Sequence, residues 1–115
     1  MKNHGYAVWY SPVSKQDLKS IYTYIAYDLR AKDTAKGLVN RIRTGIRSLS
    51  DLPERYALVD WEPWHRMGMR KMPVDNYLVY YLVHHETREV EIVRIFYGGR
   101  DIAGIVQDNS NETDS

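Results

Sequence analysis

Cationic side chains that could hold an anion occur in two places in the C-terminal half of the chain. Arg66, Arg70 and Lys71 precede a run rich in aromatic and β-branched residues. Arg100 follows the pair Gly98-Gly99, at which the backbone can take φ values closed to other residues. Such cations suit an acidic partner or the phosphates of a nucleic acid. The structural alternative is that Arg66, Arg70 and Lys71 keep an edge strand from pairing with another chain, and that Arg100 forms a surface ion pair.

The groups that could move a proton are His65, His84, His85 and Tyr97. Two of the histidines fall in an expected turn, and no H-x-x-x-H or carboxylate spacing indicates a metal site. We therefore predict no metal and no other cofactor. Cysteine is absent, which excludes disulfides, thiolate metal sites and a cysteine nucleophile.

Two apolar runs, 77–83 and 90–97, must position these groups. They read YLVYYLV and VEIVRIFY, and the polar segment between them favours a β-hairpin. Neither run alternates cleanly between apolar and polar residues, so we expect the hairpin at the centre of a sheet with both faces largely covered. Arg94 interrupts the second run and would need an acidic partner such as Glu62 or Asp75.

A strand and a first helix are expected at the N-terminus. The strand covers 6–10, and Pro12 ends it because proline cannot supply a ladder N–H. Ser14 is the expected N-cap of a helix over about 15–30, with Asp17 as the acid at N3. The apolar positions of this helix repeat at helical spacing and are Leu18, Ile21, Tyr22, Ile25 and Leu29.

A second helix follows after a short link. It is expected to start from a cap at Asp33 or Thr34 and to stop before Pro53. Because the link is short, the two helices should be antiparallel neighbours that lie on a sheet. The apolar stripe of the second helix is Ala35, Leu38, Ile42, Ile46 and Leu49.

The segment 53–68 has no clear period and is interpreted as an ordered loop. A strand is expected over 69–74, with Asp75-Asn76 as the tight turn that follows, because Asn tolerates the left-handed conformation. Trp61 and Trp64 could form an exposed aromatic platform. We favour the alternative, in which they plug the loop onto the sheet.

The composition is that of one globular domain. The chain has 115 residues, of which 43% are hydrophobic and 27% charged. We place the domain at 1–106 and expect the polar tail 107–115 to be disordered. The tail contains acids and no base, so the domain is more basic than the net charge of +1 suggests. No run approaches the ~20 apolar residues that span a bilayer, and we expect a cytoplasmic protein.

Five segments in this order resemble the RelE/ParE superfamily of toxins from bacterial type II toxin–antitoxin systems. They are YAVWYSPVS, QDLKSIYTYIAYD, SLSDLPERY, YLVYYLV and VEIVRIFYGGRDI. The resemblance implies an α+β fold in the order β-α-α-β-β-β, with an antiparallel-rich sheet and a two-helix hairpin packed on one face. It also implies an antitoxin partner that wraps the toxin.

Two activities occur in this superfamily: RelE-like members cut messenger RNA in the ribosome, and ParE-like members poison DNA gyrase. The nuclease branch places an arginine after the aromatic that begins the third strand, where this chain has Leu78. It places a tyrosine or histidine in the last turn, where this chain has Ile105 and Val106. The features that match are cations, namely Arg100, Arg70 and Lys71.

The resemblance therefore favours the ParE-like branch, because RNA cleavage needs an acid and a base as well as cations. The residues expected to bind the target are Arg100, Arg70, Lys71 and Arg66. Those expected to bind the antitoxin are Tyr24, Tyr27, Trp61 and Trp64. One alternative is a ribosome-dependent endoribonuclease that uses Arg100, Lys71, Arg70, Tyr97 and His65. The other is an inactive homologue that binds only its antitoxin, as a co-repressor, and meets DNA only through it.

Overall fold

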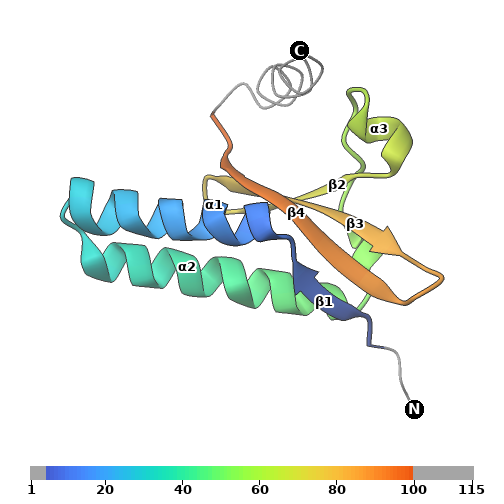
Figure 1. The fold of residues 1–115 in the computed structure, drawn as a ribbon, viewed down its shortest axis with the longest axis horizontal. Coiled ribbons are helices and arrows are strands. Elements are labelled where there is room, and N and C mark those ends of the chain that lie inside the picture. The colour runs from blue at the N-terminus through green and yellow to red at the C-terminus, as the bar shows by residue number, and fades with distance from the viewer. Residues whose placement is uncertain (1–4, 100–115) are drawn as a thin grey trace.

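The computed structural model describes residues 5–99, which form a strand, two long helices, a short third helix and three further strands (Figure 1). The elements are β1 (Ala7–Tyr10), α1 (Pro12–Thr23), α2 (Lys32–Arg47), a short α3 (Trp64–Met67), β2 (Arg70–Val74), β3 (Tyr77–His84) and β4 (Glu89–Tyr97). A π-helical turn, Tyr24–Asp28, extends α1, and 3-10 turns occupy Ser48–Ser50 and Pro53–Arg55. The predicted α+β order is confirmed. The tail 107–115 and the predicted site residue Arg100 lie outside the described residues.

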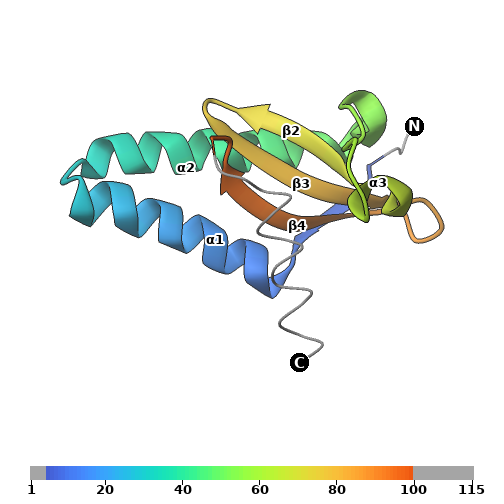
Figure 2. The ribbon, with the colours of Figure 1, turned by 90° about the horizontal axis from the view of Figure 1, so that it is seen from above.

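The four strands form one mixed sheet in the order β1-β4-β3-β2. β2, β3 and β4 are antiparallel neighbours, and β1 is parallel to β4, with Ala7 opposite Glu89. The predicted hairpin, β3 and β4, therefore lies at the centre of the sheet. The parallel pair requires a long crossover, which α1 and α2 provide, and both helices lie on the same face of the sheet (Figure 2).

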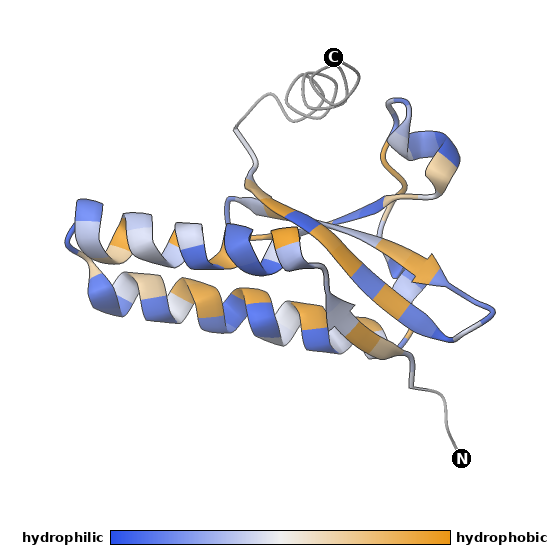
Figure 3. Cartoon of the chain, viewed as in Figure 1, coloured by the Kyte–Doolittle hydropathy of each residue, from blue (hydrophilic) through white to orange (hydrophobic). Residues whose placement is uncertain are grey.

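The main core lies between this helical hairpin and the sheet. The predicted stripe of α2 and the following turn is at most 5% exposed, and it packs with side chains of β2, β3 and β4. Figure 3 shows hydrophobic residues recurring along α2 and along the strands. The buried strand residues on this face are Met72, Val79, Tyr81, Val90, Ile92 and Ile95. Burial of this kind is worth roughly 25 cal/mol per Å² of apolar area, so the stripe fixes α2 against the sheet. None of the helices within 5–99 is long and apolar enough to cross a membrane.

The caps of both helices differ from the prediction. The N-cap of α1 is Ser11, whose hydroxyl accepts the N–H of Ser14 at 3.0 Å, and Ser14 itself is fully buried. Pro12 takes the first helical position, where its fixed φ is pre-organised and its missing N–H costs nothing. The prediction treated Pro12 only as the end of a strand. The second helix starts at Lys32 after Ala31, without a side-chain cap.

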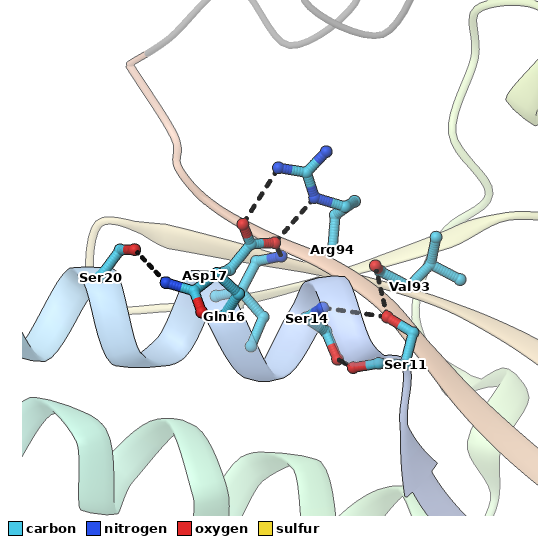
Figure 4. A network of polar contacts seen from close by, with 8 residues as sticks. Ser11, Ser14, Gln16, Asp17, Ser20, Val93 and Arg94 are labelled. Atoms are coloured by element: carbon cyan, nitrogen blue, oxygen red, sulfur yellow. Dashed lines mark hydrogen bonds and ion pairs between the residues drawn. The ribbon is translucent and has the colours of Figure 1, made fainter. Parts of the chain in front are cut away.

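The expected partner of Arg94 was also wrong. Asp17 of α1 is the partner, with one carboxylate oxygen 2.8 Å from Nε and the other 3.0 Å from a terminal nitrogen (Figure 4). The first of these oxygens also accepts the backbone N–H of Ile95 at 2.9 Å. The two acids predicted for this role bind other arginines, Glu62 with Arg66 and Asp75 with Arg41.

The Asp17 carboxylate binds the part of the β4 edge that has no neighbouring strand. β1 pairs with β4 only as far as Ile92, so the edge of β4 beyond that residue has no neighbouring strand. The Ser11 hydroxyl donates to the carbonyl of Val93 at 3.0 Å, and Asp17 accepts the next N–H that points to this edge. The start of α1 thus replaces a strand as the partner of β4, and the acid predicted to cap a helix stabilises a sheet instead.

The tight turn between β2 and β3 is where it was predicted, but a different residue takes the left-handed conformation. Asp75 has φ 53, whereas Asn76 accepts the N–H of Gly98 at 2.7 Å through its carbonyl. Asp shares with Asn a short polar side chain that tolerates this region. The end of β4 is therefore tied to the β2–β3 turn.

Candidate functional site

The face of the sheet opposite the helices carries the cations that could meet a target. The strand register places Lys71 opposite Tyr80, and Tyr80 opposite Arg94. Because side chains alternate between faces, these three form a row across the sheet, next to a row of Pro73, Leu78 and Phe96. The Arg94 guanidinium lies 4.3 Å from the centre of the Phe96 ring. We call this surface the open sheet face.

Two tryptophans cover part of the open sheet face. Trp61 and Trp64 are stacked with ring centres 4.9 Å apart, and Trp64 lies 4.8 Å from Tyr80. Trp64 is only 6% exposed, and Val59 and Met69 complete this second small core. The plug interpretation is confirmed. A role in antitoxin binding stays a prediction for both residues, although only Trp61 has an appreciable exposed area.

The structure does not bring Arg70 and Lys71 together. They are neighbours on β2 and point to opposite faces of the sheet. Arg70 donates to the carbonyls of Tyr56 at 2.7 Å and Glu54 at 3.2 Å, and its side chain is 19% exposed. It fixes the loop before β2. Lys71 lies on the open sheet face and makes no ion pair with the described residues.

The other predicted cation and the candidate proton carriers have local partners. Arg66 pairs with Glu62 one helical turn away, at 3.3 Å. Its backbone N–H donates to the same carboxylate, which lowers the pKa of Glu62. His65 donates Nδ1–H to the carbonyl of Val59 at 2.8 Å, a bond that fixes its tautomer. His85 lies between the Tyr6 hydroxyl and Glu54, at 2.9 Å from each. Within 5–99, no three potential ligands gather to hold a metal ion.

Tyr97 ends β4 on the helix-facing side and is 47% exposed. Its ring packs edge-on against Tyr77, with centres 5.5 Å apart. A Cβ at Gly99 would lie 2.7 Å from the Tyr97 ring, and one at Gly98 would lie 3.1 Å from the carbonyl of Asn76. Glycine therefore leaves room for the Tyr97 ring and the Asn76 carbonyl where the chain leaves the sheet, although neither Gly98 nor Gly99 has a positive φ. Lys71, Tyr97 and His65 do not form one constellation.

The tyrosines whose pKa is raised do not offer a general base either. Burial raises the pKa of Tyr81 to about 12, and burial is also the main cause of the raised pKa values of Tyr10, Tyr77 and Tyr80. A phenol with a raised pKa stays protonated near neutral pH. The Tyr81 hydroxyl donates to the carbonyl of Pro53 at 2.6 Å, which is a structural role.

The helical side, where Tyr24 and Tyr27 were expected to meet the antitoxin, carries two grooves. One, of about 640 Å³, lies between the end of α1 and the unpaired part of β4, and Tyr24 lines it. The other, of about 720 Å³, runs between α1 and α2, and we call it the helical groove. Tyr27, 57% exposed, packs edge-on against Tyr22 of the helical groove. The two tyrosines predicted to bind an antitoxin thus border different grooves.

The architecture defines the class of protein: a RelE/ParE-like α+β domain, with a helical hairpin on one face of a mixed four-stranded sheet. A similar solved structure is the chromosomal ParDE toxin–antitoxin system from P. aeruginosa, with a TM-score of 0.66 and 20% identity over 83% of this chain and 98% of that chain. Another is the RelBE2 toxin–antitoxin complex from Mycobacterium tuberculosis, with a TM-score of 0.56 and 18% identity over 81% of this chain and 98% of that one. At these identities the likeness establishes the fold.

The sequence gives the narrower assignment. A family model described as the ParE toxin of the type II toxin–antitoxin system, parDE, matches residues 8–102. The chain therefore belongs to the ParE toxin family. None of the curated proteins compared with the chain matches it.

Proposed function

We propose that this protein inhibits growth by binding and poisoning DNA gyrase. The observation that carries the proposal is the dispersal of the groups a nuclease would need, because Lys71, Tyr97 and His65 lie apart. Leu78 also stands where the resemblance to the superfamily places an arginine in the nuclease branch. Cations without a nearby proton carrier suit docking better than acid–base catalysis. The family assignment supports the same branch.

The open sheet face is the proposed target-binding surface. Lys71 supplies a cation there that has no ion-pair partner within residues 5–99, and the exposed Arg66 lies on α3 beside the tryptophan plug. Arg100, which lies outside the described residues, follows directly after Gly99 and remains part of the proposal. Arg70 contributes by holding the loop in place and not by direct contact, because its guanidinium is occupied by two carbonyl groups.

A cognate antitoxin neutralises the toxin in this proposal. Support comes from the similar solved structures, both of which are described as toxin–antitoxin systems or complexes. The aromatic residues proposed to contact it are Tyr24, Tyr27, Trp61 and Trp64. The first two are more than half exposed, so their rings are accessible to a partner.

The test is a supercoiling assay with purified gyrase, run beside a messenger RNA cleavage assay on translating ribosomes. Wild-type protein should block supercoiling or trap cleaved DNA, and Lys71→Glu/Arg66→Glu should lose the effect while staying folded. Arg30→Glu/Lys32→Glu, with the same change in charge at the far end of the helical hairpin, is the control. Cleavage of messenger RNA without any effect on gyrase would support the nuclease alternative. No effect in either assay would support an inactive co-repressor.

A further inference from the structure

Four side chains that are distant in the sequence meet at the end of the sheet where β1 begins. The Tyr6 hydroxyl lies 2.9 Å from Nδ1 of His85, and Nε2 of His85 lies 2.9 Å from a carboxylate oxygen of Glu54. The Arg88 guanidinium lies 4.8 Å from the centre of the Tyr6 ring. His85 and Arg88 belong to the β3–β4 turn, which lies at the same end of the sheet as the start of β1 (Figure 1). We call Tyr6, His85, Glu54 and Arg88 the Tyr6 cluster.

The hydrogen-bond partners of His85 fix the direction in which a proton can move. Because an ionised carboxylate can only accept, Nε2 carries the hydrogen that it shares with Glu54. In the neutral ring Nδ1 then has a free lone pair, and the Tyr6 hydroxyl donates to it. The phenol therefore faces a base whose other nitrogen is held by a carboxylate. This arrangement activates hydroxyl nucleophiles in enzymes.

The carboxylate of the cluster is held in turn by a cation from β2. Arg70 lies 3.6 Å from the same Glu54 oxygen that accepts from His85, and it also donates to the backbone carbonyl of Glu54 at 3.2 Å. Glu54 thus orients the imidazole and stabilises the imidazolium that forms when His85 takes a proton. An unbroken series of contacts runs from Tyr6 to Arg70.

A cavity of about 510 Å³ opens beside the Tyr6 cluster and could admit a small molecule. Arg55 and Arg88 give its lining positive charge, and Leu52 and Pro53 add apolar surface. Arg55 donates to a loop carbonyl at 2.7 Å, so it contributes charge from a fixed position. The side chains of His85 and Glu54 are 53% and 54% exposed, so a dissolved molecule can reach them. The cavity suits an anion that carries a short apolar group.

We propose that Tyr6 is an acylation site whose substrate is a small anionic acyl donor of the acyl phosphate class. The phenol oxygen of Tyr6 attacks the carbonyl carbon of the donor, and Nδ1 of His85 takes the phenol proton. The bond between this carbon and the phosphate oxygen breaks, and the proton passes from His85 to the departing phosphate. The products are an O-acyl tyrosine and inorganic phosphate, so no further reactant is needed. Arg88 places positive charge beside the reacting groups.

The chain contains its own controls for this reaction. Tyr24 and Tyr27 are 53% and 57% exposed, whereas Tyr6 is only half-exposed in its hydrogen-bonded position. Neither of these two tyrosines is hydrogen-bonded to a histidine within residues 5–99. A reagent that simply collides with accessible phenols would modify them before Tyr6. Selectivity for Tyr6 therefore reports the histidine and not exposure.

The experiment incubates the full chain with acetyl phosphate and follows acetylation of each tyrosine by mass spectrometry of its peptides. Tyr6 should react at least about tenfold faster than Tyr24 or Tyr27, because general bases typically accelerate proton transfer by at least about a hundredfold. Excess inorganic phosphate should slow the reaction at Tyr6 by competing for the cations. Tyr6→Phe should abolish this modification and leave the other two tyrosines unchanged.

Two histidine variants separate the base from its neighbour. His85→Gln should lower the rate at Tyr6 at least about tenfold, whereas His84→Gln should leave it within about twofold. His84 is the matched control because it precedes His85 and forms its own pair with Glu91 at 2.9 Å. The rate at Tyr24 checks in each variant that the reagent is equally active, and circular dichroism checks the fold.

The pH dependence of the rate separates chemistry from a purely structural tie between Tyr6 and the β3–β4 turn. Wild type and His85→Gln should differ in this profile, since only the wild type has an imidazole to deprotonate. Glu54→Gln, which keeps a hydrogen-bond acceptor but removes the charge, should also slow Tyr6 and alter the profile.

The inference is overturned if Tyr6 reacts no faster than Tyr24 and Tyr27, or if the two histidine variants have the same effect. A Tyr6 preference with the neutral donor p-nitrophenyl acetate but not with acetyl phosphate would refute the anionic class of donor. None of these outcomes depends on gyrase, so the proposed function and the acylation site can fail separately.

Discussion

Replacing Asp17 by alanine should be the most informative single change in the sheet. The carboxylate accepts two hydrogen bonds from Arg94 and one from the N–H of Ile95, and the two side chains of the pair are 13% and 23% exposed. Its removal leaves a mostly buried guanidinium and a strand N–H without their acceptor. Hydrogen bonds to charged groups contribute about 1.5–3 kcal/mol each, and breaking a buried pair costs about 3–5 kcal/mol. Because this pair retains some exposure, we expect a loss of about 3 kcal/mol.

Urea unfolding followed by tryptophan fluorescence measures this loss, since Trp61 and Trp64 report on the packed sheet. Asp17→Asn keeps an oxygen that can accept the Ile95 N–H and should lose about half as much. A double-mutant cycle with Arg94→Ala isolates the pair and should give a coupling energy of about 2 kcal/mol.

The matched control is Arg41→Ala, which breaks an ion pair of similar length, 2.7 Å, at 56% and 41% exposure. Exposed pairs contribute about 0–1 kcal/mol. If Asp17→Ala cost no more than Arg41→Ala, the conclusion that α1 seals the edge of β4 through this carboxylate would be wrong.

Three further changes test other contacts. Arg70→Gln should cost about 1–2 kcal/mol in urea unfolding because two loop carbonyls lose their donor, while Lys71→Gln should leave stability within about 0.5 kcal/mol. Burial raises the pKa of Tyr81 from its ordinary value of about 10 to about 12 in the folded state, so the protonated phenol stabilises the fold fully below pH 10, and this contribution is lost as the pH rises from 10 to 12. Tyr81→Phe should therefore flatten the alkaline fall of the melting temperature. Gly45→Val should cost about 1–3 kcal/mol, because even a Cβ there lies 3.2 Å from the end of Met72.

The parts of the fold that were predicted correctly have local sequence patterns. The stripe from Ala35 to Leu49 repeats at helical spacing, and the hairpin strands are dense in β-branched and aromatic residues, so each pattern fixes an element without knowledge of its neighbours. The central place of the hairpin followed because neither run alternates.

The wrong predictions concern contacts between residues that are distant in the sequence, or residues that can take either of two structural roles. Asp17 and Arg94 are 77 residues apart, and no periodicity links them. Pro12 can end a strand or begin a helix, and both apply here because Ser11 lies between the two elements. The helical groove is a joint surface of two helices, so its basic lining emerges only when they are placed side by side, with Lys15 and Lys19 on α1 and Lys36 and Arg43 on α2.

The separation of Arg70 from Lys71 could have been predicted from the sequence. Arg70 and Lys71 are adjacent in a strand, and side chains in a strand alternate, so they could not share one face. The bulge in the β3–β4 ladder, between Tyr80 and Tyr81, could not have been predicted, since no glycine or other local sequence signal marks it.

The parallel pairing of β1 has a consequence for the time at which the protein can become active during synthesis. Among the described strands, β1 pairs with β4 alone, with Ala7 opposite Glu89. At a translation rate of roughly 5–20 residues per second, β1 waits for several seconds before that partner exists. The nascent chain therefore completes the sheet of residues 5–99 only when β4 has been made, which leaves an interval in which another protein could bind the earlier segments before the sheet is complete.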